Sequence, residues 1–79
     1  MEQKYKEKIK KIFSEVMGII ITEVNNNLNS DSLAAWDSLR HLNLISEIEK
    51  EFTIDIDMDD VIEMDTFQKI IEKLSKYLD

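Results

Sequence analysis

The sequence predicts an all-α fold, a small four-helix bundle with three long helices, a short third helix and a long loop between helices 1 and 2. Three observations lead to this prediction. Proline is absent and Gly18 is the sole glycine, so residues that interrupt helices are scarce. Apolar residues recur at helical spacing in several stretches. The 79 residues suffice for one domain, which we expect to span residues 1–79.

The first helix is expected over residues 2–17, followed by a long loop. The apolar face of the helix comprises Tyr5, Ile9, Ile12, Phe13, Val16 and Met17. Gly18 follows directly and favours a left-handed C-terminal cap. Residues 18–36 are rich in asparagine and serine, which hydrogen-bond to their own backbone and favour turns. Isolated apolar residues are expected to pin this loop to the core: Ile20, Val24, Leu28, Leu33 and Trp36.

A second helix is expected over residues 38–52, with Asp37 accepting hydrogen bonds from the free N–H groups of its first turn. Its predicted apolar stripe is Leu39, Leu42, Ile45, Ile48 and Phe52. Each such stripe is buried only when it meets the stripes of other helices, which is why the pattern predicts a bundle.

Two further helices complete the predicted fold. A short third helix starts at Asp57 or Asp59 and contains Val61, Ile62 and Met64. A fourth is capped by Asp65 or Thr66 and carries the stripe Phe67, Ile70, Ile71, Leu74 and Leu78.

Composition narrows the classes of function. Cysteine is absent, which excludes disulfides and thiolate metal sites, and we expect a cytoplasmic protein without membrane insertion. The net charge of −7 argues against nucleic-acid binding, which needs clustered lysine and arginine. Residues 47–65 contain nine acidic residues and one lysine. This acidic region is either a solvated face or a surface that steers basic partners toward the protein.

The sequence contains no complete pattern for a catalytic site or for a metal site. Ser38 and His41 are neighbours on one helical turn, but no third group orients the histidine, so we expect a surface histidine and no enzyme. Acids alternate from Asp55 to Asp60 as at the start of a calcium loop. The glycine and glutamate that such a loop requires at positions six and twelve are replaced by Asp60 and Thr66, so no metal site is expected.

The tripeptide Asp-Ser-Leu occurs twice, at residues 31–33 and 37–39. Ser38 lies where a helix begins, and the free N–H groups and dipole of a helix N-terminus suit a phosphate. From local chemistry alone, a helix cap formed by Ser38 or Asp37 is the simpler interpretation.

The segment 37–52, DSLRHLNLISEIEKEF, resembles the acyl carrier proteins in its Asp-Ser-Leu start, apolar stripe and acidic run closing in Phe52. The resemblance spans essentially the whole chain. It includes Val24 upstream, Ile54 and Ile56 downstream, and the segment 65–67 that enters the last helix. Fourteen residues beyond Ser32 lies Ser46 and no aromatic residue, so Ser38 is the serine that fits the family pattern.

The resemblance implies that Ser38 is esterified with 4′-phosphopantetheine, transferred from coenzyme A by a phosphopantetheinyl transferase. Asp37 and Leu39 would complete the cofactor-binding residues: Asp37 would help bind the magnesium ion in the transferase complex, and Leu39 would be an apolar contact for the incoming enzyme. The arm would hold acyl intermediates as thioesters in fatty acid, polyketide or another specialised acyl biosynthesis. The protein would be a monomer that meets acyl-loading and acyl-transfer enzymes with basic docking surfaces. Its partner-binding residues would be Arg40, Leu42, Asn43, Glu47, Glu49, Glu51, Asp59 and Asp60.

Departures from the family pattern keep other interpretations open. Arg40 and His41 stand where common fatty-acid carriers place acids, and Trp36 resembles carriers of specialised pathways. An aminoacyl, D-alanyl or peptidyl carrier is one alternative, and an unmodified acidic interaction domain with the carrier fold is another. An acyl chain that enters the bundle would meet residues that otherwise simply form core: Ile45, Ile56, Val61 and Ile62.

Overall fold

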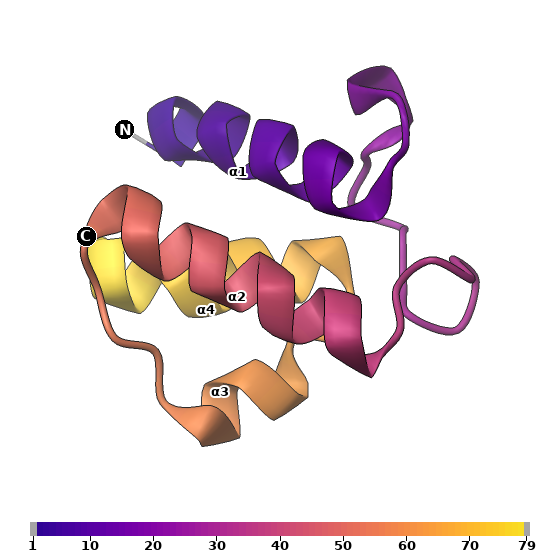
Figure 1. Cartoon of the computed structure of the whole chain (residues 1–79). Helices are drawn as coiled ribbons and strands as arrows, with labels where there is room; N and C mark the ends of the chain where they lie inside the picture. Colours follow the sequence, from indigo (N-terminus) through magenta and orange to yellow (C-terminus); the bar gives the residue numbers. More distant parts are fainter. Residues whose placement is uncertain (1, 79) are drawn as a thin grey trace.

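The computed structural model describes residues 2–78, with side chains from Tyr5 onward. It contains four α-helices and one short 3₁₀ helix (Figure 1): α1 (Glu2–Met17), η1 (Ile21–Glu23), α2 (Ser38–Phe52), α3 (Met58–Glu63) and α4 (Phe67–Leu78). The predicted class, a helical bundle with three long helices and a short third one, is confirmed. Within residues 2–78 the extended pairing is limited to an isolated antiparallel bridge between Asn29 and Thr66.

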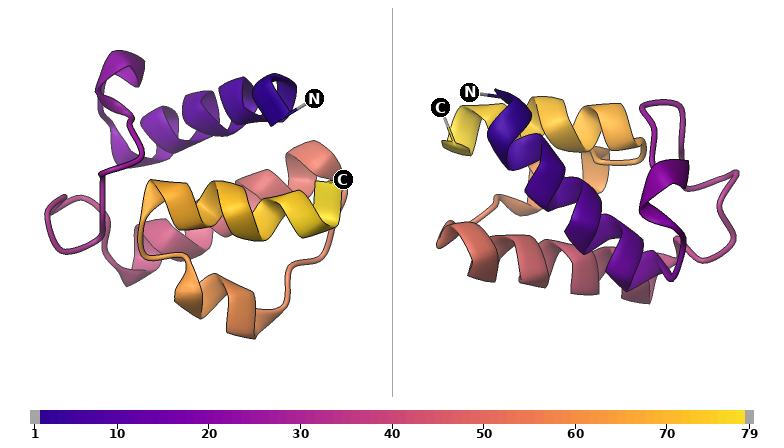
Figure 2. Two further views of the ribbon diagram at one scale, coloured as in Figure 1. Left: turned by 180° about the vertical axis from the view of Figure 1, so that it is seen from behind. Right: turned by 90° about the horizontal axis from the view of Figure 1, so that it is seen from above.

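The long helices pack around one core, with α1 running opposite to α2 and α4 (Figure 1). Seen from above, α1 crosses over the other two, and the start of α1 lies at the same end of the molecule as the end of α4 (Figure 2). The short α3 lies along the side of the bundle. Because α2 begins at Ser38, directly after the long loop, its N-terminal end lies at the same end of the molecule as that loop.

Three aromatic rings form the centre of the core. Phe13 from α1 meets Trp36 edge-on at 5.0 Å between ring centroids, and it meets Phe67 of α4 in the same manner at 5.5 Å. Edge-to-face contacts of this kind add to the stabilisation from burial itself. Further fully buried residues come from all four helices or their ends: Ile9, Leu44, Ile48, Met64, Ile70 and Leu74.

Helix ends follow recognisable local chemistry. Gly18 has a φ of 72°, and the N–H of Ile19 donates to the Ser14 carbonyl, so α1 ends in a Schellman motif as Gly18 predicts. The hydroxyl of Thr66 accepts the N–H of Lys69 at 3.0 Å and caps α4. At the end of α2, Thr53 adopts a φ of 54°, a conformation that is unfavourable for a β-branched residue. The sequence pattern gave no sign of a left-handed residue there.

Main-chain hydrogen bonds fix the long loop to the start of α4. The N–H of Ser30 donates to the Asp65 carbonyl, and the N–H of Phe67 donates to the Leu28 carbonyl. Within the loop, the Asn29 side-chain oxygen accepts the N–H groups of Asp31 and Ser32 at 2.9 Å each. The loop is thus an ordered connection that delivers Trp36 into the core and Asp37 to the start of α2.

The prediction of core residues is wrong at several positions. In α2 the reason is that the buried face of the helix is rotated relative to the predicted apolar stripe. Leu39 and Leu42 are 68% and 51% exposed, whereas Leu44 is fully buried. The inward face runs through positions 41, 44, 45, 48 and 52, which is ordinary helical spacing with His41 as its first member. The apolar pattern of the sequence did not indicate this inward face, because His41 is polar. Two isoleucines expected in the core are also exposed, Ile20 in the loop and Ile62 on α3.

Candidate functional site

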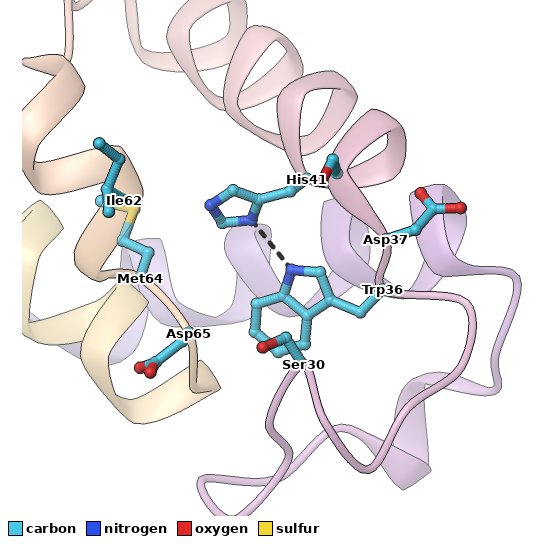
Figure 3. Close-up of a pocket in the computed structure, with 8 residues that line it drawn as sticks. Ser30, Trp36, Asp37, His41, Ile62, Met64 and Asp65 are labelled. Carbon is cyan, nitrogen blue, oxygen red and sulfur yellow. Dashed lines mark hydrogen bonds between the residues drawn. The ribbon is translucent and has the colours of Figure 1, made fainter.

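A cavity of about 370 Å³ opens beside Ser38, between the loop, the first turn of α2 and the end of α3 (Figure 3). It is lined by Ser30, Trp36, Asp37, Ser38, His41, Ile62, Met64 and Asp65. Two segments far apart in the sequence, residues 30–41 and 62–65, thus meet around one serine. Of the residues expected to line an acyl pocket, Ile62 borders this cavity, while Ile45, Ile56 and Val61 are buried in the core.

Asp37, not Ser38, caps α2. One carboxylate oxygen of Asp37 accepts the N–H of Arg40 at 2.8 Å, and the other lies 3.5 Å from the guanidinium of Arg40. This confirms the predicted N-cap. It also decides between the two residues left open by local chemistry, because Ser38 is the first residue of the helix and its side chain is exposed. An exposed hydroxyl at a helix N-terminus is accessible to a modifying enzyme and favourably placed for a phosphate group.

His41 connects both sides of this cavity, and the expectation of a surface histidine is wrong. The indole N–H of Trp36 donates to His41 Nδ1 at 2.9 Å (Figure 3). His41 Nε2 lies 2.8 Å from the Val61 carbonyl oxygen. An indole nitrogen only donates and a carbonyl only accepts. These partners therefore assign the neutral ring with its proton on Nε2. Sequence reasoning missed this role because Val61 lies 20 residues from His41.

Apolar side chains remain in solvent on the two helices beside the cavity. Leu39 and Leu42 project from α2, and Met58 and Ile62, which are 62% and 71% exposed, project from α3. The predicted apolar contact residue Leu39 is therefore accessible, one residue after Ser38. Exposed apolar groups of this size next to a site are typical of protein contact surfaces.

The predicted partner-binding acids differ in their availability. Glu47, Glu51 and Asp59 are exposed, as are Arg40 and Asn43, although Glu51 lies 3.4 Å from Lys8 in an ion pair. Glu49 is half-buried, and its carboxylate accepts the N–H of Ile56 at 2.9 Å, which ties the end of α2 to the following segment.

The expectation that Asp60 belongs to the exposed acidic surface is wrong. Asp60 is only 5% exposed, and its carboxylate lies 2.8 Å from Lys76 Nζ and 3.7 Å from Lys73 Nζ. The Tyr77 hydroxyl donates to the same carboxylate and accepts the N–H of Asp57 at 3.0 Å. Asp60 is thus used to hold α3 against α4. No sequence pattern indicates this cluster, because only tertiary packing brings α3 to the last turn of α4.

The Asp60 cluster predicts an acid-dependent loss of stability. Hydrogen bonds from Lys76 and Tyr77 lower the pKa of Asp60 below its usual 3.8, against the opposing effect of burial. A lowered pKa in the folded state stabilises the protein at pH values above 3.8, and this contribution is lost as the pH falls through the folded-state pKa. In Asp60→Asn, we expect a lower urea midpoint at pH 7 and a smaller further decrease between pH 4 and pH 2 than in the wild type.

Urea unfolding followed by circular dichroism between pH 2 and pH 7 measures both effects. Asp59→Asn is the matched control, because Asp59 is the exposed neighbour on the same helical turn. An equal loss of stability in both variants at pH 7 would contradict the role given to the Asp60 cluster.

Residues 2–78 contain neither a membrane-spanning helix nor a metal-binding cluster. None of the described helices has the length and apolar character needed to cross a membrane. Within the same residues, no group of three acidic, histidine or cysteine side chains is arranged to hold a metal ion.

Two similarities to known proteins identify the family of the chain. The family model for the phosphopantetheine attachment site matches residues 7–74. The acyl carrier protein of Buchnera aphidicola subsp. Schizaphis graminum (strain Sg) is 41% identical over 69 residues, which cover 86% of each chain. The chain therefore belongs to the acyl carrier proteins, a family that carries phosphopantetheine and is not enzymatic.

Proposed function

We propose that Ser38 carries the 4′-phosphopantetheine arm and that the loaded arm delivers acyl groups as thioesters to partner enzymes. The observation that carries this proposal is the exposed serine at the first position of α2, beside the cavity. The cap by Asp37 leaves the Ser38 hydroxyl exposed. The N–H groups and dipole of the helix N-terminus favour the negative phosphate that would be esterified there.

Ser32, the second serine in the same tripeptide, is less suited to carry the arm. Its hydroxyl donates to the Asn29 carbonyl at 3.1 Å and accepts the Asn29 N–H at 3.4 Å, so it forms part of a turn. Esterification would remove the hydroxyl proton that makes the first of these bonds. Ser32 also precedes no helix, and it has no equivalent of the helix dipole.

The test is to identify which residue takes up the arm. The protein is incubated with coenzyme A, magnesium and a promiscuous phosphopantetheinyl transferase, and its intact mass is measured. Cleavage on the N-terminal side of aspartate then separates the two serines, because Asp37 lies between them. We expect a gain of one phosphopantetheine on the peptide that starts at Asp37. No gain with several transferases would favour the alternative of an unmodified interaction domain.

We further propose that this is a dedicated carrier of a specialised acyl pathway and that it is a cytoplasmic monomer. Arg40 supports the first part of this proposal. Its side chain is 47% exposed, it lies 3.5 Å from Asp37, and its guanidinium donates to the Ala35 carbonyl, so a positive charge lies next to Ser38. Exposed charges at a contact rim act mainly on encounter rate and on the choice of partner. Enzymes adapted to acids at this position would meet a repulsive group here.

Housekeeping enzymes provide the test of this second proposal. We expect a housekeeping ketosynthase and malonyl transferase to process the loaded wild-type protein poorly. We expect Arg40→Glu to improve turnover by about tenfold, which corresponds to the change of about 1.4 kcal/mol expected when repulsion is exchanged for attraction at a contact rim. Lys50→Glu is the matched control at the far end of α2, where the same change of charge should have little effect. Normal turnover of the wild type would contradict a dedicated role.

A further inference from the structure

We propose that His41 is a positioning residue of the Ser38 site. It acts as a neutral ring that joins Trp36, which precedes the site, to Val61 of α3. The hydrogen bonds are those already described, 2.9 Å to Trp36 and 2.8 Å to Val61. The expected effect of His41 on arm transfer rests on the proposed role of Ser38. The two hydrogen bonds of His41 can be tested in the protein without the arm.

Each bond fixes a different wall of the cavity. Trp36 lies two residues before Ser38 and is 4% exposed, and its ring is packed edge-on against Phe13. Holding this ring therefore fixes the backbone that leads into Asp37 and Ser38. Val61 belongs to the six-residue helix α3, and its carbonyl accepts the N–H of Met64 at 3.2 Å at the end of that helix. The bond from His41 adds a second donor to this carbonyl and fixes α3 opposite α2.

The two bonds use the ring of His41 in opposite senses. In the neutral ring, Nδ1 accepts from Trp36 and Nε2 donates to Val61. A replacement side chain with one suitably placed polar atom can therefore keep one bond and lose the other.

Two acidic side chains share the cavity with His41: Asp37, at the start of α2, and Asp65, before α4. Arg40, the neighbour of His41 in α2, points toward Asp37 and the Ala35 carbonyl. From α1, Phe13 meets Trp36 through an apolar contact.

Two variants separate the two hydrogen bonds. Asparagine places its amide oxygen near the position of Nδ1, so His41→Asn keeps an acceptor for Trp36 and loses the donor to Val61. Glutamine places its amide nitrogen near the position of Nε2, so His41→Gln keeps the donor to Val61 and loses the acceptor for Trp36. Both variants remove the imidazole ring. A histidine that served only to fill space would respond alike to the two replacements.

The first experiment tests the hydrogen-bond chain in the unloaded protein. Long-range ¹H–¹⁵N spectra of the single histidine should show the proton on Nε2 in the neutral ring. Emission from the single tryptophan should differ from that of the wild type in His41→Gln, which loses the bond to the Trp36 indole, and should stay close to it in His41→Asn. A proton on Nδ1, or unchanged emission in His41→Gln, would overturn the inference.

The second experiment tests positioning through transferase kinetics, with circular dichroism to confirm that each variant is folded. We expect His41→Gln to raise the KM for the carrier about fivefold, the effect of one lost hydrogen bond, with kcat little changed. We expect His41→Asn to stay within about twofold of the wild type, because it keeps the bond to Trp36. An equal rise in both variants would overturn the positioning role. A wild type that accepts no arm would instead refute the proposed function, and the spectra would still decide the geometry of His41.

Discussion

Ser38→Ala is expected to abolish attachment of phosphopantetheine while leaving the fold intact. The hydroxyl is the proposed point of esterification, so its removal leaves no acceptor for the arm. Because Asp37 supplies the cap of α2 and Ser38 is exposed, the free energy of unfolding should change by no more than about 0.5 kcal/mol. Intact mass after incubation with the transferase, together with urea unfolding, measures both quantities on the same sample.

Ser32→Ala is the matched control, and its expected behaviour is the opposite. The variant should accept one arm as the wild type does. It should lose about 1 kcal/mol of stability, because the Ser32 hydroxyl bonds the backbone of Asn29 in the loop turn. Failure of Ser32→Ala to accept the arm, combined with normal loading of Ser38→Ala, would exchange the roles of the two serines and contradict the proposed function.

Phe13→Ala is expected to cause the largest loss of stability. Phe13 is fully buried and makes edge-on contacts with both Trp36 and Phe67. Removing a buried phenylalanine side chain costs about 3–5 kcal/mol. A 79-residue domain has a total stability of about 4–12 kcal/mol at 0.05–0.15 kcal/mol per residue, so much of the folded state would be lost. Urea unfolding, followed by circular dichroism and by Trp36 emission, measures the change.

Phe52→Ala is the control for Phe13→Ala. Phe52 is a half-buried phenylalanine at the C-terminal end of α2, so its removal should cost clearly less. Phe13→Ala should also impair arm transfer in the absence of urea. The reason is that Phe13 packs against Trp36, which directly precedes Asp37 and Ser38. Equal losses of stability in the two variants would show that Phe13 is not the centre of the core.

Local sequence determined the helices and their ends. Apolar periodicity placed α1 at 2–17 and α2 at 38–52, and Gly18, Asp37 and Thr66 marked ends whose hydrogen bonds involve residues only a few positions away. The doubled tripeptide and the spacing from Ser38 to Phe52 also lie within a short stretch of chain. Such features are visible in the sequence because the interacting groups are close along the chain.

Tertiary structure alone decided which side chains meet at the site. The inward face of α2 includes His41 in place of Leu39 and Leu42, since the phase of a helix is set by the partners it packs against. His41 meets Val61 across 20 residues, and Asp60 meets Tyr77 across 17, so neither pair follows from local spacing. The sequence by itself determined the helices and the serine that fits the family pattern. The packing of α3 against α2 and α4 determined the surroundings of that serine, because it joins groups that are distant along the chain.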